Sequence, residues 1–384
     1  MQIPPETLPT NLAIVHEWLV ARAGSEKVVE QMLAVFPQAD LFSLVKFLET
    51  ENPLRIPATT QVQTSFIQRL PWARSHFRQY LPLMPLAVEQ FDLSPYDLVL
   101  SSNHAVAKGA VTRADQLHIS YVHTPIRYAW DLQHQYLEQA GLKTGLKSAL
   151  ARPLLHYLRL WDVAAAQRVD CFLANSHYVA RRVWKTYRRR AEVIYPPVAV
   201  DRFRWHRSRE DFYLTVSRCV PYKRVDLTVA TFNRLGLPLV VIGDGPALTA
   251  LQQMAQPNIT FLRNSTDAVV SDYMERCRGF IFPAEEDFGI TVVEAQAAGA
   301  PVIAYGRGGS GETVLDGKTG VLFRQQTVND LVEAVDYFRN NQNSFQAEII
   351  RKQAETFSEQ RFRHELATFV ADRWLKFNRG DALE

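Results

Sequence analysis

Short apolar runs alternate with longer amphipathic stretches along this chain, and glycine, proline or charged residues separate them. Short runs of this kind are typical of buried parallel strands, whereas a spacing near 3.6 residues predicts helices. In the first half, the pattern predicts strands at residues 12–16, 98–101, 119–122 and 171–176, and helices at 25–36 and 178–187. The alternation predicts a parallel sheet that helices cover on both faces.

A break in this pattern lies at Pro196-Pro197 and the charged run 202–211. After it the alternation begins again, with strands predicted at 212–217, 239–243, 259–262, 279–282 and 301–305. The 384 residues exceed the usual size of one hydrophobic core. We therefore expect an α/β protein with two Rossmann-like domains, residues 1–205 and 206–361, that face each other across a cleft.

The composition is that of an ordinary globular protein, with 47% hydrophobic and 22% charged residues. The net charge of +3 is too small to indicate nucleic-acid binding by itself. No apolar run approaches the roughly 18 residues that cross a bilayer, and residues 1–10 lack the pattern of a secretory signal. The expectation is a cytoplasmic protein.

Neither a metal nor a cofactor is expected from the sequence. The motif Asp-x-Asp is absent, and Cys171, Cys219 and Cys277 lack the spacing of metal ligands. Widely spaced cysteines without partners also indicate a reducing compartment.

Two carboxylates flank a predicted turn from a strand to a helix. Residues 279–282 predict a buried strand, and residues 289–298 predict a short helix that ends at Gly299. Glu286 falls in the turn, where it can accept hydrogen bonds from sugar hydroxyls, and Glu294 falls inside the helix, within reach of ribose hydroxyls. Ligands of open α/β sheets bind at such strand ends, where helix N-termini favour phosphates. Each carboxylate alone is equally well explained as a solvated surface residue.

Two cations follow another predicted strand. Arg218 and Lys223 come after residues 212–217 and precede a helical pattern that begins at Val225. Two positive charges at a helix entrance suit a diphosphate leaving group, because they stabilise the charge that develops on the departing phosphate. The alternative is that Lys223 and its neighbour Arg224 are solvated residues near a helix start.

Two glycine-rich motifs imitate phosphate-binding loops. Residues 306–311 satisfy the dinucleotide fingerprint, but residues 312–320 are too short and too rich in turns for the helix that must follow it. Residues 317–319, Gly-Lys-Thr, imitate the end of a phosphate loop, yet Glu312 occupies the position of its first glycine. We expect neither motif to bind phosphate, and we expect 317–319 to form a turn before a strand at 321–323.

The combination of these motifs resembles the retaining nucleotide-sugar glycosyltransferases of family 4, which have the two-domain GT-B fold. The resemblance spans nearly the whole chain and rests on residues 24–27, 101–102, 107–109, 123–131, 217–223, 241–246, 283–290 and 298–312. Residues 123–131 are most similar to the bacterial branch that builds O-antigen and exopolysaccharide, often from GDP-mannose. The resemblance also implies that the last helix, about 362–384, packs back on the first domain.

The resemblance implies roles for matched residues on the donor side. Arg218 and Lys223 would bind the donor diphosphate, and Glu286 would bind hydroxyls of the transferred sugar. The donor-binding set implied is Gly24, Arg218, Lys223, Glu286, Phe288, Gly289, Ile290 and Glu294. Gly24 would let the backbone approach the phosphates, because glycine has no Cβ. Members of the family usually carry a second glycine where this chain has Ala23, so the tightness of this loop differs.

His123 is the fourth candidate catalytic residue, after Arg218, Lys223 and Glu286. A lone histidine is ordinarily a satisfied core or cap residue, but His123 follows the strand 117–122, so we expect it beside the reacting sugar. Arg127, Tyr128 and Asp131 are candidate contacts to the acceptor. The expected reaction transfers a hexosyl group, mannose from GDP-mannose being the best candidate, to a hydroxyl of a glycan or lipid-linked acceptor, with retention of configuration.

Other functions and partners stay open at this point. An epimerase or phosphorylase of nucleotide sugars has the same fold, and a non-catalytic partner of a polysaccharide assembly complex would also bind a nucleotide sugar. Basic residues cluster at 181–190 and, with aromatic residues, at 68–86. Such clusters favour peripheral contact with an anionic membrane, and the alternative for 181–190 is a solvated helix face.

Overall fold

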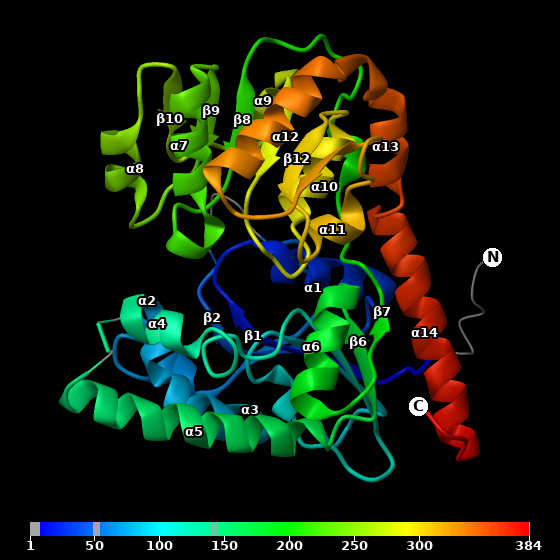
Figure 1. The fold of residues 1–384 in the computed structure, drawn as a ribbon. Helices are drawn as coiled ribbons and strands as arrows, with labels where there is room; N and C mark the ends of the chain where they lie inside the picture. Colours follow the sequence, from blue (N-terminus) through cyan, green and yellow to red (C-terminus); the bar gives the residue numbers. More distant parts are fainter. Residues whose placement is uncertain (1–7, 49–53, 140, 143, 384) are drawn as a thin grey trace. The chain divides into compact units, whose positions relative to one another are not determined.

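The computed structural model describes residues 8–48, 54–139, 141–142 and 144–383. The chain forms two compact units, one of residues 1–195 with 362–384 and one of residues 196–361. Each unit holds one parallel sheet with helices on both faces (Figure 1). The predicted α/β class with two Rossmann-like domains is therefore confirmed.

The sheet of the first unit is built around the neighbouring strands β1 and β4. Its strands are β1 (Leu12–Leu19), β2 (Asp40–Lys46), β3 (Val62–Thr64), β4 (Leu98–Asn103), β5 (Leu117–Val122), β6 (Cys171–Ala174) and β7 (Glu192–Val193), in the order β3-β2-β1-β4-β5-β6-β7. All pairs are parallel, and His16 of β1 stands opposite Ser102 of β4. The chain builds the sheet outward from β1 in one direction and from β4 in the other.

Both faces of β1 are buried, which explains why its sequence is almost continuously apolar. Alternate side chains point to opposite faces of a strand. On one face, Ile14 shares an apolar cluster with Phe36, which caps the helix that follows β1, and with Phe362 of the last helix. On the other face, Val15 packs with Val88.

The helices of this unit are α1 (Gly24–Val35), α2 (Ala73–His76), α3 (Met84–Glu89), α4 (Gln133–Gln139), α5 (Leu146–Ala166), α6 (His177–Tyr187) and α14 (Glu359–Arg379), which starts in the second unit. The 3-10 helices are η2 (Phe66–Arg69), η3 (Phe77–Leu83) and η4 (Ala107–Gly109).

The sheet of the second unit repeats the same plan around β8. Its strands are β8 (Tyr213–Val216), β9 (Leu239–Ile242), β10 (Ile259–Leu262), β11 (Gly279–Phe282), β12 (Val302–Tyr305) and β13 (Gly320–Phe323), in the order β10-β9-β8-β11-β12-β13. The helices are α7 (Val225–Leu235), α8 (Leu248–Met254), α9 (Asp267–Arg276), α10 (Ile290–Ala297), α11 (Ser310–Thr313), α12 (Val328–Asn340) and α13 (Ala347–Glu355), with η5 (Val200–Arg202), η6 (Pro221–Lys223) and η7 (Gln342–Ser344). Tyr213, Phe232 and Phe338 form an aromatic cluster in the core.

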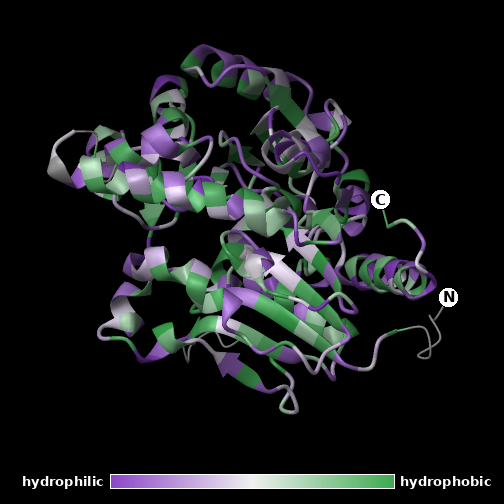
Figure 2. Ribbon diagram, turned by 90° about the horizontal axis from the view of Figure 1, so that it is seen from below, coloured by the Kyte–Doolittle hydropathy of each residue, from purple (hydrophilic) through white to green (hydrophobic). Residues whose placement is uncertain are grey.

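The helix α5 has 21 residues and one partly apolar outer face. Leu150 and Leu160 are 70% and 60% exposed, and Tyr157 is 47% exposed. Hydrophobic and hydrophilic residues are interspersed along this helix (Figure 2). Within the part of the chain that the structure describes, no helix combines the length and the apolar character needed to cross a membrane.

A buried ion pair joins η4 to α5. Lys108 and Asp162 are both fully buried and form an ion pair, and the other carboxylate oxygen of Asp162 accepts hydrogen bonds from Trp130 Nε1 and Tyr187 Oη at 2.8 and 2.9 Å. A buried pair is tolerated when its remaining polar atoms are satisfied in this way. The segment 107–109 therefore has a structural role.

We expect Lys108→Ala to destabilise the folded state by about 3–5 kcal/mol, because it leaves Asp162 charged and buried without its cation. Lys352→Ala is the matched control, because Lys352 also has an ion pair, with Glu348, but is 71% exposed. Its effect should stay within about 0.5 kcal/mol. Urea unfolding of both variants measures the difference, and equal stabilities would show that the buried pair contributes nothing.

Candidate functional site

Each sheet has one place where ligands of this class of fold bind. In open α/β sheets the site lies beyond the carboxyl ends of the two strands between which the strand order reverses. In the first unit these strands are β1 and β4, and in the second they are β8 and β11. The residues predicted for the donor site follow β8 and β11, apart from Gly24, and the predicted acceptor contacts follow β5, the neighbour of β4.

Lys223 and Glu286 meet at the reversal point of the second sheet. Lys223 ends η6 after β8, Glu286 lies in the turn after β11, and the two side chains form an ion pair. The lysine and glutamate side chains are 16% and 18% exposed. Arg218, also after β8, is exposed. The structure thus brings the predicted cation and the predicted turn carboxylate together although 63 residues of sequence separate their positions.

The glycine-rich motif at 306–311 supports the Glu286 turn. The backbone of Gly308 bridges to Glu286, and Gly309 N donates to Glu286 O at 2.8 Å. Gly308 has φ +76°, and a Cβ at this position would lie 2.2 Å from Glu286 O. The helix that follows, α11, covers only Ser310–Thr313, so this loop lacks the dinucleotide-binding helix, as predicted. The glycines permit a close approach of two loops.

Glu294 lies inside α10 and is only 6% exposed. Its Oε1 accepts a hydrogen bond from Arg202 Nη2 at 3.1 Å. The helix begins after Gly289, whose φ is +85°, and Ile290 is its first residue. The Phe288 side chain is buried against Phe357, with ring centroids 5.6 Å apart. Phe288, Gly289 and Ile290 therefore lie at the N-terminus of α10. Sequence reasoning missed Arg202, the partner of Glu294.

His123 follows β5 and belongs to a polar network in the first unit. Its Nε2 lies 2.9 Å from Ser102 Oγ, and His16 Nδ1 lies 3.2 Å from the same oxygen. Burial, assisted by the positive charges of His104 and His16, lowers the pKa of His123 to about 3. The ring is therefore neutral at pH 7. Burial alone would lower the pKa of His16, but the hydrogen bond and charge of Glu26 outweigh it and raise that pKa.

Glu17 is a fully buried carboxylate that sequence reasoning missed. Its Oε1 accepts hydrogen bonds from the backbone N–H groups of residues 104–107 at 2.8–3.1 Å. Its Oε2 lies 2.9 Å from His104 Nδ1. Burial by itself would raise the pKa of Glu17, but the charge and hydrogen bond of His104, together with His16 and the backbone, lower it well below its usual range. Glu17 is therefore a carboxylate at all ordinary pH values.

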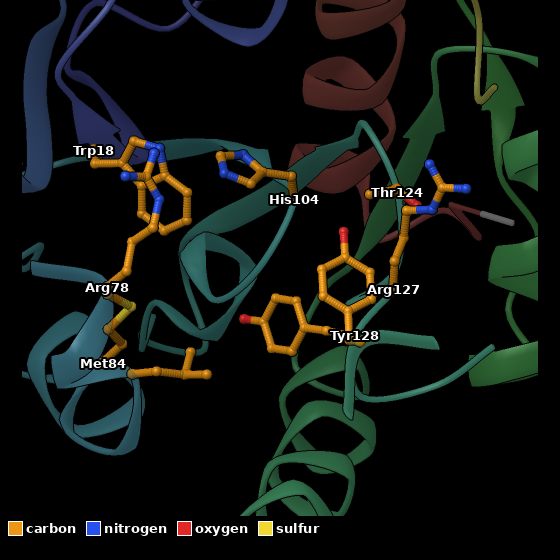
Figure 3. A pocket seen from close by; sticks show the side chains of 9 residues that line it. Trp18, Arg78, Met84, His104, Thr124, Arg127 and Tyr128 are labelled. Atoms are coloured by element: carbon orange, nitrogen blue, oxygen red, sulfur yellow. The ribbon is translucent and has the colours of Figure 1, made fainter. Parts of the chain in front are cut away.

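A pocket of about 300 Å³ opens beside this network (Figure 3). The residues that line it are Trp18, Arg78, Leu81, Met84, His104, Thr124, Arg127, Tyr128 and Tyr136. Two of the three predicted acceptor contacts, Arg127 and Tyr128, are among them. Asp131 is not among these lining residues of the described chain, and it pairs with Arg182 Nη2 at 2.7 Å. Burial, with a smaller contribution from the charge of Glu17, raises the pKa of Tyr128.

Gly24, the remaining predicted donor contact, is the first residue of α1 and follows Ala23, its N-terminal cap. It lies a few residues beyond the end of β1, at the reversal point of the first sheet. Among the described residues, no group of three or more His, Cys, Asp or Glu side chains is arranged to hold a metal ion. The ligand roles of all these residues stay predictions.

Family models match both halves of the chain. Residues 24–202 match the model described as Glycosyltransferase Family 4, and residues 200–357 match the model described as Glycosyl transferases group 1. This chain belongs to glycosyltransferase family 4. The match of the two models to the two successive halves agrees with the resemblance inferred from the motifs.

Curated relatives of this family 4 protein match only part of it. An uncharacterized glycosyltransferase of Methanocaldococcus jannaschii is 30% identical over 46% of this chain and 52% of its own length. The O-antigen chain mannosyltransferase C of Escherichia coli is 28% identical over 46% of this chain and 53% of its own length. A GDP-mannose-dependent phosphatidylinositol monomannoside mannosyltransferase of Mycolicibacterium smegmatis is 32% identical over 31% of this chain and 36% of its own length. The chain thus spans about half, or less, of the length of these relatives.

Solved structures agree with the GT-B fold over nearly the whole family 4 chain. Sucrose-phosphate synthase of Thermosynechococcus elongatus superposes with a TM-score of 0.73 at 15% identity and covers 94% of this chain and 98% of its own. Anabaena HepE in complex with UDP and glucose gives a TM-score of 0.69 at 16% identity over 94% and 99%. Identities this low establish the fold alone.

Proposed function

We propose that this protein transfers a hexosyl group from a nucleotide diphosphate sugar to a hydroxyl of a glycan or lipid-linked acceptor in polysaccharide biosynthesis. The observation that carries the proposal is the Lys223–Glu286 pair at the reversal point of the second sheet. Mannose from GDP-mannose is our best candidate donor, supported by relatives named as mannosyltransferases. We also propose retention of configuration, on family resemblance.

The Lys223–Glu286 pair places one positive and one negative side chain where a single nucleotide sugar could contact both. Lys223 and the exposed Arg218 would hold the diphosphate, while the Glu286 carboxylate accepts hydrogen bonds from sugar hydroxyls. As the glycosidic bond breaks, negative charge grows on the departing phosphate, and fixed cations stabilise it more in that state than before. With no covalent nucleophile assigned, the departing phosphate takes the acceptor proton on the same face.

The N-terminus of α10 would complete the donor site. The turn that carries Glu286 leads into α10 through Phe288, Gly289 and Ile290, and the first backbone N–H groups of a helix favour negative charge. Glu294, whose Oε1 accepts a hydrogen bond from Arg202, would bind the ribose. The neutral His123 would lie beside the transferred sugar, where an uncharged ring can hydrogen-bond without attracting the phosphate.

Melting temperatures with GDP-, UDP-, ADP- and dTDP-sugars test the donor. A ligand at 100 times its Kd stabilises the folded state by about 2.7 kcal/mol. We expect GDP-mannose to raise the melting temperature more than the other nucleotide sugars. With an acceptor present, we expect the turnover of GDP-mannose to be unchanged by EDTA. Loss of turnover in EDTA that manganese restores would contradict the metal-free mechanism, and no shift with any nucleotide sugar would contradict the donor site.

The acceptor requirement separates the other functions. An epimerase converts the donor without any acceptor, a phosphorylase needs phosphate, and a non-catalytic partner binds the donor without consuming it. Donor consumption that depends on an added glycan acceptor supports transfer.

Membrane contact stays a prediction for the segment 68–86. This segment exposes Trp72 and Leu86, at 79% and 49%, and carries Arg69, Arg74 and Arg78. Each cation near an anionic surface contributes about 1 kcal/mol. In the cluster 181–190, by contrast, Arg182 forms an ion pair with Asp131, and Arg189 donates hydrogen bonds to backbone carbonyls of the same unit.

A further inference from the structure

One face of α6 borders another pocket of the first unit, to which the proposed transfer reaction gives no role. Its volume is about 590 Å³, and it lies beside β7, the edge strand of the sheet (Figure 1). The residues that line it are His177, Ala180, Arg181, Trp184, Arg190 and Ala191. The first four recur at spacings of three and four residues, so they share one face of the helix. A volume of this size is typical of sites for small ligands.

Positive charge is concentrated on the segment that forms this pocket. Residues 177–190 contain five arginines and one lysine but no aspartate or glutamate, whereas the whole chain has a net charge of only +3. The acids that flank the segment are engaged elsewhere. Asp170 accepts a hydrogen bond from the backbone N–H of His118 at 2.7 Å. Glu192 forms an ion pair with Arg373. The segment therefore carries charge that its own sequence does not neutralise.

The structure divides these cations into two groups. Arg182 and Arg189 stabilise the fold through the contacts described above. Arg181 and Arg190 are exposed and line the pocket, and within the described part of the chain neither forms an ion pair or a side-chain hydrogen bond. Like charges one helical turn apart, such as Arg181 and Lys185, also destabilise a helix. An ordinary solvated helix face does not explain this arrangement, whereas a bound anion would offset the repulsion.

Trp184 adds a flat apolar surface to the same pocket. It is 51% exposed and lies one helical turn beyond Arg181. Among the described residues, no other ring contacts its indole. An exposed indole can stack on the face of another ring, and a guanidinium group can bind a phosphate through two parallel N–H bonds. The pocket therefore combines groups that bind phosphate with a surface that binds a ring.

We propose that this pocket binds a small phosphate ester, either a nucleotide or a sugar phosphate. Arg181 and Arg190 bind its phosphate, and Trp184 covers the ring of its base or sugar. This site goes beyond the proposed transfer function and does not depend on it, because none of its residues belongs to the donor set. A hollow bounded by α6 on one side and by residues 190–191 on the other favours a small ligand over the flat surface of a membrane.

The indole N–H of Trp184 reports on this pocket. Nitrogen-15 NMR of the full chain resolves the signals of its seven tryptophans, and the signal that disappears in Trp184→Phe is that of Trp184. The probes are inorganic phosphate, GMP and mannose 1-phosphate. We expect at least one of the two esters to shift the Trp184 signal at a lower concentration than inorganic phosphate, because only the esters carry a ring. The ester that binds more tightly identifies the source of the phosphate.

Arg181→Gln should weaken the binding of that ester about tenfold or more, because it removes a charged hydrogen-bond donor. Lys185→Gln is the matched control. It removes the same charge from the same exposed helix, but Lys185 is not among the residues that line the pocket. Its effect on affinity should stay within about twofold. Equal losses in the two variants would show that overall charge alone attracts the ligand, and would overturn the site.

Lys223→Ala keeps this site apart from the donor site. We expect the response of Trp184 to the ester to persist in this variant. A response lost in Lys223→Ala, or no response of Trp184 to either ester, would overturn the site. A response to vesicles of phosphatidylglycerol but to no soluble ester would also overturn it and assign the cluster to a membrane surface. A persistent response in a chain whose melting temperature no nucleotide sugar raises would refute the donor site and leave this pocket in place.

Discussion

Lys223→Ala and Glu286→Ala are each expected to lower the rate of sugar transfer by two orders of magnitude or more. Lys223 is one of the two cations, with Arg218, that we propose to hold the departing phosphate, and loss of one fixed electrostatic stabiliser costs about 10²–10³ in rate. Glu286 binds the sugar that must align with the acceptor. Initial rates at saturating donor measure the effect, with circular dichroism to confirm that each variant is folded.

Lys318→Ala is the matched control. Lys318 is an exposed lysine of the same unit, in the Gly-Lys-Thr turn that imitates a phosphate loop. Its loss should leave transfer within about twofold of the wild type, as for most surface changes distant from a site. Near-normal rates in both Lys223→Ala and Glu286→Ala would show that the donor site is elsewhere. A large loss of transfer in Lys318→Ala would indicate that the turn 317–319 does bind phosphate, contrary to our prediction.

Gly308→Ala is expected to reduce both stability and transfer, because the new Cβ would lie 2.2 Å from Glu286 O. Gly317→Ala is a close control, since its φ of +72° nearly equals the +76° of Gly308 but nothing lies within 4 Å of its Cβ position. Both variants carry about 1–2 kcal/mol of backbone strain. The contact adds about 1–3 kcal/mol in Gly308→Ala alone.

We expect the rate of transfer, like the stability, to fall more in Gly308→Ala than in Gly317→Ala. A displacement of about 1 Å in a positioning group lowers a rate about 10²-fold, and the clash moves the turn that carries Glu286. Urea unfolding and initial rates of both variants measure the two effects. Equal losses in Gly308→Ala and Gly317→Ala would mean that the glycine loop does not position Glu286.

The sequence predicted those elements whose local pattern is unambiguous. The runs that became β1, β8, β11 and β12 are short, apolar and bounded by turn residues, so their burial could be inferred. β2 was missed although it is buried, because the polar residues Asp40 and Ser43 interrupt its apolar run. α5 was missed because Pro153 and the exposed Leu150 and Leu160 blur its helical periodicity.

The site was predictable where its residues directly follow recognisable strands, and unpredictable where it depends on which elements become neighbours in space. Arg218, Lys223 and Glu286 each follow a recognisable strand, so their convergence could be expected. The contacts of Glu17 with His104 and of Arg202 with Glu294 depend on which elements become neighbours in space. His16 and Ser102 face each other only because β1 pairs with β4, an order that propensity and periodicity do not encode.

A crystal structure of the full chain with GDP-mannose would test the donor site most directly. We predict that the diphosphate lies within hydrogen-bonding distance of Lys223 Nζ and the Arg218 guanidinium, and that a mannose hydroxyl donates to the Glu286 carboxylate. Nucleotide sugar bound away from β8 and β11, with the Lys223–Glu286 pair unchanged and in contact with no ligand atom, would contradict this assignment.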